Sequence, residues 1–142
     1  MRVVLDTNVL VSSLISPAGS SAAIYDAWIE GRFTLLTSRE QMIEVRATLR
    51  KPKLVNHITR AEAGRLVNDL LAFAALVKKT PDVRRSPDPE DDFLLELSEG
   101  GNADYLVTGD KSGLLSLIRH GRTRIVSVGY FCHSVLRRPP RA

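Results

Sequence analysis

The stretch Val3-Val4-Leu5-Asp6-Thr7-Asn8-Val9-Leu10 begins with an apolar run that three small polar residues interrupt. The run is too short for a helix and is apolar at consecutive positions, which predicts a strand covered on both faces, as in parallel sheets. Asp6 then lies at the carboxyl end of that strand, where open α/β sheets bind their ligands. The same residue types also cap helices well, so this stretch alone leaves Asp6 open to a capping role and to a role in an active site.

Strand and helix patterns alternate along the rest of the chain. Two capping boxes, Ser38-Arg39-Glu40-Gln41 and Thr59-Arg60-Ala61-Glu62, predict helix starts, and Phe73 belongs to the apolar face of the second helix. The alternation predicts a three-layer α/β/α domain with a mainly parallel sheet. The expected helices cover 9–15, 22–29, 39–51, 60–73 and 91–99, and the expected strands cover 3–5, 33–37, 76–77, 103–108 and 124–128.

The length and composition predict a single globular domain over residues 1–142. Hydrophobic residues make up 44% of the chain and charged residues 25%, which excludes disordered and fibrous proteins. The longest apolar run, 70–77, is far shorter than the roughly 20 residues that a membrane helix needs. No export signal precedes Asp6, and the single cysteine, Cys132, has no internal partner, so we expect a cytoplasmic protein.

Basic residues exceed acidic ones and give a formal net charge of +4. Polyanions such as nucleic acids are therefore plausible partners. Each basic group alone is more often an ordinary solvated face than a binding site. The groups are Arg46, Arg50, Lys51 and Lys53; Arg84 and Arg85; Arg119, Arg122 and Arg124; and Arg137, Arg138 and Arg141.

Acidic residues gather where the predicted strands end. Asp6 and Asp110 each follow a strand, and the proline-containing loop 84–90 leads to a helix start with further acids at Asp88, Glu90, Asp91 and Asp92. Two carboxylates about 5 Å apart repel by roughly 3 kcal/mol at an effective dielectric near 20, so such a cluster requires a cation or a proton. Oxygen-only ligands suit Mg²⁺ or Mn²⁺, which generate hydroxide from water and neutralise the charge that develops on a phosphodiester.

Three segments of the chain resemble the signature motifs of the PIN-domain family. They are Leu5-Asp6-Thr7-Asn8-Val9-Leu10, Asp88-Pro89-Glu90-Asp91-Asp92 and Ala103-Asp104-Tyr105-Leu106-Val107-Thr108-Gly109-Asp110-Lys111. The similarity runs nearly end to end and is closest to the branch that holds the toxin components of toxin–antitoxin systems, relatives of the VapC toxins. The resemblance implies a compact α/β/α ribonuclease that depends on Mg²⁺ or Mn²⁺, with single-stranded RNA as substrate, an antitoxin protein as partner and a homodimer as its assembly.

The same resemblance implies the site residues. The acidic quartet is Asp6, Glu44, Asp91 and Asp110, of which Asp6, Asp91 and Asp110 are the metal ligands; Asn8, Ser12 and Thr108 support them. Helical periodicity does not favour Glu44, because Met42, Val45 and Leu49 mark the main apolar face and Glu44 is predicted to point nearly opposite. Many relatives carry another acid shortly after the last aspartate, where this chain has Ser112 and Gly113.

Helical phase separates the adjacent residues Asp91 and Asp92. At about 100° per residue, Asp91 shares a face with Leu94, Leu95 and Ser98, which are expected to pack on the sheet. Asp92 aligns with the glutamates at 96 and 99, so we expect that face to be solvated. The phase predicts that Asp91 points toward the strand ends and that Asp92 does not.

Two other function classes compete with the ribonuclease. One is a module with the PIN fold that binds RNA or a partner without cleaving it, although intact Asp6, Asp91 and Asp110 argue against such a loss. The other is a phosphatase of the haloacid dehalogenase type, which needs a second aspartate where this chain has Asn8. The three histidines lack metal-ligand spacing and are expected at the surface. Tyr130, Phe131 and Val135 could form an exposed apolar patch for a partner, but we expect them to pack as part of a terminal helix or strand.

Overall fold

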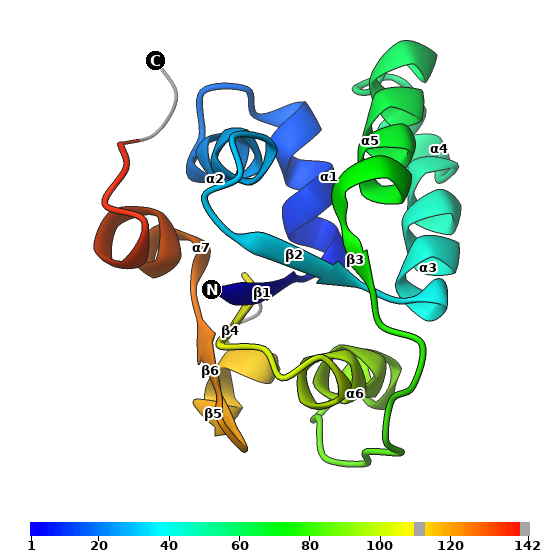
Figure 1. Cartoon of the computed structure of the whole chain (residues 1–142). Coiled ribbons are helices and arrows are strands. Elements are labelled where there is room, and N and C mark those ends of the chain that lie inside the picture. The colour runs from blue at the N-terminus through cyan, green and yellow to red at the C-terminus, as the bar shows by residue number, and fades with distance from the viewer. Residues whose placement is uncertain (110–112, 140–142) are drawn as a thin grey trace.

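A computed structural model describes residues 1–109 and 113–139 of the chain (Figure 1). The strands are β1 (Arg2–Leu5), β2 (Thr34–Thr37), β3 (Ala75–Leu76), β4 (Tyr105–Val107), β5 (Arg119–His120) and β6 (Thr123–Val126). The helices are α1 (Thr7–Ile15), α2 (Ser20–Ile29), α3 (Arg39–Leu49), α4 (Pro52–Val55), α5 (Arg60–Phe73), α6 (Asp92–Gly100) and α7 (Val128–Tyr130). Short 3-10 turns cover Pro89–Asp91 (η1) and Leu114–Leu117 (η2), and a π-helical turn covers Phe131–Val135 (η3).

The strands form one sheet in the order β3-β2-β1-β4-β6-β5. Every neighbouring pair is parallel except β5 and β6. β1 lies between β2 and β4, where Val4 is in register with Leu36 on one side and with Leu106 on the other. The predicted first strand is therefore central to the sheet, as its continuous apolar sequence indicated.

Consecutive residues of β1 enter two different cores, which makes the domain three layers thick. Val3 and Leu5 join the core under α1, α2, α3 and α5, whereas Val4 joins the core formed with α6. Figure 1 shows these helices on the two sides of the sheet. All three β1 residues are at most 1% exposed, which confirms the predicted α/β/α architecture and explains why the strand does not alternate with polar residues.

The helix that starts at Ser38 differs in one respect from the predicted capping box. The Ser38 hydroxyl accepts the backbone N–H of Gln41, as expected. The Gln41 side chain turns inward instead of back to the cap: its amide donates to the Leu5 carbonyl (2.7 Å), and its oxygen accepts from the Thr37 hydroxyl (2.8 Å). Gln41 thus ties α3 to the ends of β1 and β2, while the second box, at Thr59 and Glu62, forms completely.

Other predictions were wrong in detail. Phe73 is 64% exposed, because α5 buries Leu66 and Leu70 and ends where the chain turns into β3. The hairpin of β5 and β6, which turns at Gly121 with φ of +57°, was not predicted because β5 is only two residues long. His120 is half-buried and bonds Glu99 and Arg85, unlike the surface histidine expected, whereas Phe131 is fully buried as predicted.

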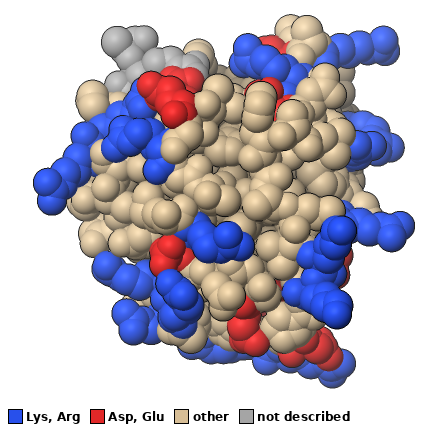
Figure 2. Space-filling model, viewed as in Figure 1, with Lys and Arg blue, Asp and Glu red and all other residues tan. Residues whose placement is uncertain are grey.

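Two further features concern the surface. Among the described residues, no helix has the length and apolarity needed to cross a bilayer. Lys and Arg side chains surround the face shown in Figure 2 and do not gather in one patch. Positive charge alone therefore does not select a nucleic-acid site on this face.

Candidate active site

The topology places a ligand-binding position between the carboxyl ends of β1 and β4. From β1 the chain proceeds to β2 on one side, while β4 pairs on the other side, so the strand order reverses between β1 and β4. In open parallel sheets such a reversal leaves a crevice outside the strand ends. Asp6 lies directly after β1, and its backbone N–H donates to the carbonyl of Val107, the last residue of β4 (2.9 Å).

Asp6 both caps α1 and presents its carboxylate at this crevice. One carboxylate oxygen accepts the backbone N–H of Asn8 (3.2 Å), and the other accepts the hydroxyl of Thr108 (2.8 Å). The residue is 7% exposed and Thr108 is fully buried. The capping role is therefore confirmed, and the cap and the hydroxyl of Thr108, which follows β4, orient the two carboxylate oxygens. A role of Asp6 in an active site, with Thr108 as its support, stays a prediction.

Glu44 lies near Asp6, contrary to the prediction from helical periodicity. Burial raises the pKa of the Glu44 carboxyl above its usual range, and the negative charges of Asp6 and Glu90 add to the rise, while the Thr7 hydroxyl and Lys51 oppose it. The periodicity misled because α3 buries the polar residues Gln41 and Thr48 beside its apolar ones. These two residues flank Glu44, so its half-buried side chain lies at the edge of the inward face.

Glu90 is a further acidic residue near Glu44, and the sequence predicted only that it belongs to a group of acids at the start of a helix. It is the middle residue of η1, where Pro89 begins the turn and the Asp88 carboxylate accepts the Glu90 backbone N–H (3.0 Å). Its negative charge acts on Glu44. A proline after a capping aspartate was the available signal, since proline is favoured in the first turn of a helix.

Asp91 and Asp92 have different surroundings, and the prediction for Asp92 needs correction. Asp91 is half-buried at the junction of η1 and α6, and the residues predicted to share its face, including Leu94 and Ser98, are fully buried. Asp92 was expected on a solvated face, yet its carboxylate accepts the backbone N–H groups of Arg85 (3.1 Å) and Ser86 (2.7 Å). The preceding loop thus covers the face and satisfies its charge.

Glu96, one turn further along the same face of α6, also binds the loop that precedes the helix. Its carboxylate accepts the backbone N–H of Val83 (2.9 Å), so α6 anchors the loop at two carboxylates. The sequence could not indicate this, because helical phase says nothing of a loop that folds back over an acidic face.

A cavity of about 350 Å³ opens at the crevice. Its lining includes Asp6, Asn8 and Ser12, which are three of the residues that the sequence assigned to the site. Ser21, Gly109 and Val128 complete the wall, with Val9. Asp110, the residue after Gly109, lies outside the described residues.

The carboxylates near this cavity supply only oxygen donors. Within residues 1–109 and 113–139, no group of three or more His, Cys, Asp or Glu side chains is close enough to hold a metal ion. Asp6 and Glu44 nevertheless lie close enough for each charge to act on the other. Carboxylate oxygens are the donors that Mg²⁺ and Mn²⁺ prefer, so Asp6 at the crevice is compatible with such an ion.

Comparison with known proteins agrees with this geometry. The family model for the PIN domain matches residues 2–112. The chain belongs to the PIN-domain family. An uncharacterized protein of Methanocaldococcus jannaschii, MJ1680, is 28% identical over 120 residues, which cover 82% of this chain and 75% of that protein.

The fold of this PIN protein also resembles a solved structure. The crystal structure of VapBC2 from Rickettsia felis, bound to a DNA fragment from their promoter, aligns with a TM-score of 0.59 and covers 89% of this chain and 98% of the matched chain. The identity is 13%, so the likeness concerns the fold. PIN domains are in general nucleases that use divalent metal ions, and membership of this family removes the support for a phosphatase of the haloacid dehalogenase type.

Proposed function

We propose that this PIN protein is a metal-dependent endoribonuclease that hydrolyses phosphodiester bonds of single-stranded RNA, as the toxin of a toxin–antitoxin pair in the cytoplasm. The observation that carries the proposal is the Asp6 carboxylate, which Thr108 and the Asn8 backbone hold beside an open cavity at the reversal between β1 and β4. The charge of Asp6 also acts on the Glu44 carboxyl. Two like charges placed together at a ligand-binding edge gain stability when a cation binds between them.

In this proposal Asp6, Asp91 and Asp110 hold Mg²⁺ or Mn²⁺, and Glu44 completes the catalytic quartet. An ion held there would supply a hydroxide nucleophile and would neutralise charge on the phosphate. Asp6 reaches its position without rearrangement, because Thr108 and the Asn8 backbone already orient both of its oxygens. Such preorganised groups contribute more than mobile ones, since no energy is spent on ordering them during the reaction.

Asn8 and Ser12 give the cavity polar walls. Both line it next to Asp6, Asn8 as an exposed residue and Ser12 as a half-buried one. An amide and a hydroxyl can each donate hydrogen bonds to phosphate or sugar oxygens. We propose that they orient the substrate, a role that neutral side chains can fill.

The toxin role, an antitoxin partner and a homodimer are further parts of the proposal. They rest on the signature motifs and on the similarity of the fold to the VapBC2 structure. The single domain over residues 1–142 is supported by the terminal segment, in which Phe131 and Leu136 are buried in the core that α1 and α2 share. Light scattering of the purified protein tests the homodimer, and co-purification with the product of an adjacent small open reading frame tests the antitoxin.

The alternative is a PIN module that binds RNA or a partner without cleaving it. Ser112 and Gly113 occupy positions where many PIN relatives carry an acid, which favours this alternative over a full metal centre. The two functions differ in turnover and not in binding, so one experiment separates them.

That experiment follows end-labelled single-stranded RNA with the purified protein in Mg²⁺, in Mn²⁺ and in EDTA. We expect internal cleavage with either ion and none in EDTA, and we expect Asp6→Asn to be inactive. Asp82→Asn is the matched control. This exposed aspartate forms a 3.8 Å ion pair between its Oδ2 and Arg84 Nη2, and it is not among the residues that line the cavity at Asp6. Binding without cleavage in either ion supports the module instead, and cleavage that survives chelation overturns the metal requirement.

A further inference from the structure

A second cavity adjoins the carboxylate pocket at α1. Its volume is about 210 Å³, and it shares Asn8 and Ser12 with the first cavity. The remaining lining residues are Val11, Ile15, Ser16, Thr48, Lys51, Lys53 and Leu54. We call this second cavity the α1–α3 groove and define it by its lining residues.

Two helical stripes make the walls of this groove. Asn8, Ser12 and Ile15 recur at i, i+4 and i+7 on α1, so they lie on one face. Thr48 and Lys51 follow Glu44 with the same spacing on α3 and its end. From Asn8 to Ile15 the stripe extends about 10 Å at 1.5 Å per residue, which gives the groove the length of more than one phosphate contact.

The two adjoining cavities carry opposite charge. Asp6 lines the carboxylate pocket, and Lys51 and Lys53 line the α1–α3 groove. Both lysines are exposed, and the Lys51 charge is close enough to Glu44 to act on its carboxyl. Two ammonium groups in a groove that adjoins a carboxylate pocket attract an anion that extends away from that pocket.

The middle of the groove is apolar. Val11 and Leu54 contribute buried and half-buried surface, and Ile15, which is 39% exposed, adds an accessible apolar side chain. A single-stranded nucleotide presents both kinds of surface, with a phosphate for the lysines and a base or sugar face for the apolar wall. An acidic protein segment matches the lysines but has no reason to extend into the carboxylate pocket.

We propose that the α1–α3 groove binds the RNA nucleotide adjacent to the bond that is cleaved, with Lys51 and Lys53 on its phosphate and Ile15, Val11 and Leu54 against its base or sugar. This inference rests on the proposed ribonuclease function and assigns it a direction: the substrate leaves the carboxylate pocket along α1 toward α4. Lys51 and Lys53 are positioning residues, because they contact the substrate away from the reacting phosphate.

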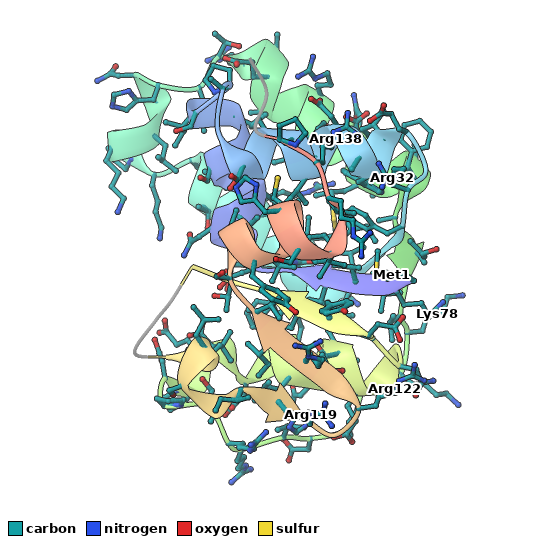
Figure 3. The ribbon with its side chains drawn as sticks, turned by 90° about the vertical axis from the view of Figure 1, so that its left-hand side faces the viewer. Met1, Arg32, Lys78, Arg119, Arg122 and Arg138 are labelled. Atoms are coloured by element: carbon teal, nitrogen blue, oxygen red, sulfur yellow. The ribbon has the colours of Figure 1, made fainter. Side chains whose placement is uncertain are left out.

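The test measures binding separately from cleavage. A fluorescent single-stranded RNA of mixed sequence is titrated with wild-type protein in EDTA, over a range of salt concentrations. The variant is Lys51→Gln with Lys53→Gln. The matched control is Lys78→Gln with Lys79→Gln, which removes the same charge from another neighbouring lysine pair; Figure 3 shows Lys78 on the same side of the molecule as Met1 and Arg122.

We expect the groove variant to bind at least about tenfold more weakly near 0.1 M salt and to lower the slope of log K against log salt by about 1.4, since each phosphate contact on a single strand contributes about 0.7. In Mg²⁺ its KM should rise while kcat changes little. The control pair should leave the slope and KM near those of the wild type, and melting temperatures should show that all proteins are folded.

Three results overturn the inference in different ways. If the wild type binds no single-stranded RNA, the proposed function fails and the groove loses its ligand. If the wild type binds RNA but the two double variants lose equal affinity, the function stands and the groove is not the path. A lower kcat with unchanged KM in the groove variant also contradicts a positioning role.

Discussion

The two edges of the parallel sheet use their carboxylates differently. At the amino-terminal edge, Asp104 accepts the backbone N–H of Arg2 (2.8 Å) and the guanidinium of Arg122 (2.7 Å), and the backbone bond of Arg2 is the main reason that the pKa of Asp104 lies below its usual value. Figure 3 shows Arg122 and Met1 on this side of the molecule. At the carboxyl-terminal edge, Glu44 is partly buried near two other acids, and its pKa is raised.

The difference separates an acid whose charge folding favours from one whose charge folding disfavours. Asp104 joins β1 and β4 through the hydrogen bonds of its own side chain and backbone, so folding favours its charge. Glu44 is held beside Asp6 although folding disfavours its charge, and such an arrangement is typical of binding and catalytic sites. The two edges therefore predict opposite results when a carboxylate is replaced by its amide.

The largest expected effect concerns Asp6. Asp6→Asn should lower the rate of RNA cleavage at saturating Mg²⁺ by at least about 100-fold, because it removes a preorganised negative ligand from the site. The amide keeps the side-chain oxygen that caps α1, so circular dichroism should show an intact fold. Asp104→Asn at the other edge should keep its cleavage rate and lose stability instead, and an equal loss of activity in both variants breaks the comparison.

The next effect separates Asp91 from Asp92. Asp91→Asn should abolish metal-dependent cleavage and leave the melting temperature nearly unchanged. Asp92→Asn should keep most of its activity but lose about 1–2 kcal/mol of unfolding free energy, because a neutral amide oxygen accepts the two backbone N–H groups of the preceding loop more weakly than the charged carboxylate does. Cleavage rates and urea unfolding of the two variants measure this, and the reverse ranking of activity shows that the assigned ligand is wrong.

These two residues also show what the sequence could predict. Helical phase correctly placed Leu94, Leu95 and Ser98 in the core, since apolar periodicity reports burial against the sheet. It missed the loop that covers Asp92, because the hydrogen bonds there join a side chain to backbone groups that carry no sequence signature. Phase is thus informative about apolar contacts and silent about polar ones.

The same limit of apolar periodicity explains why the position of Asp6 could be predicted and that of Glu44 could not. The position of Asp6 was predictable, because a fully apolar strand that ends in a polar residue must present that residue at the sheet edge. The inward position of Glu44 was not, because Gln41 and Thr48 are polar yet buried by bonds and packing at the strand ends. Only the family resemblance indicated Glu44, and its role remains a prediction.

A smaller effect is expected at Glu44, where the same substitution should raise the stability and lower the activity. A raised pKa means that the folded protein holds this proton more tightly than the unfolded chain does, so the free energy of unfolding falls as the pH rises from the ordinary carboxyl range through the raised value. Glu44→Gln should remove that fall and be more stable than the wild type at pH 7 in EDTA, by less than about 1 kcal/mol because solvent screens a half-buried group. Its cleavage rate should nevertheless decrease.

Chemical denaturation at pH 4, 5, 6 and 7 measures the Glu44 prediction. The wild type and variant should be nearly equal at the lowest pH and diverge as the pH rises. Adding Mg²⁺ should stabilise the wild type more than the variant. A variant that is less stable than the wild type at pH 7 indicates that Glu44 is a structural acid like Asp104.

The smallest expected effect divides the two partners of Asp104. Arg122 is exposed, with 62% of its side chain accessible, so its ion pair is screened and Arg122→Ala should cost no more than about 0.5 kcal/mol. Asp104→Asn should cost more, because it also weakens the bond from the Arg2 backbone, which is the larger cause of the lowered pKa. Because folding lowers the pKa of Asp104, its contribution to stability is complete at pH values above the ordinary carboxyl pKa. That contribution is lost as the pH falls through the lowered pKa of the folded protein.

Unfolding of both variants at pH 7 in low and high salt checks the ranking. Salt should reduce the small cost of Arg122→Ala and hardly change the cost of Asp104→Asn. If Arg122→Ala costs as much as Asp104→Asn, the ion pair and not the backbone holds this edge together, and the contrast between the two edges then depends on surface charge.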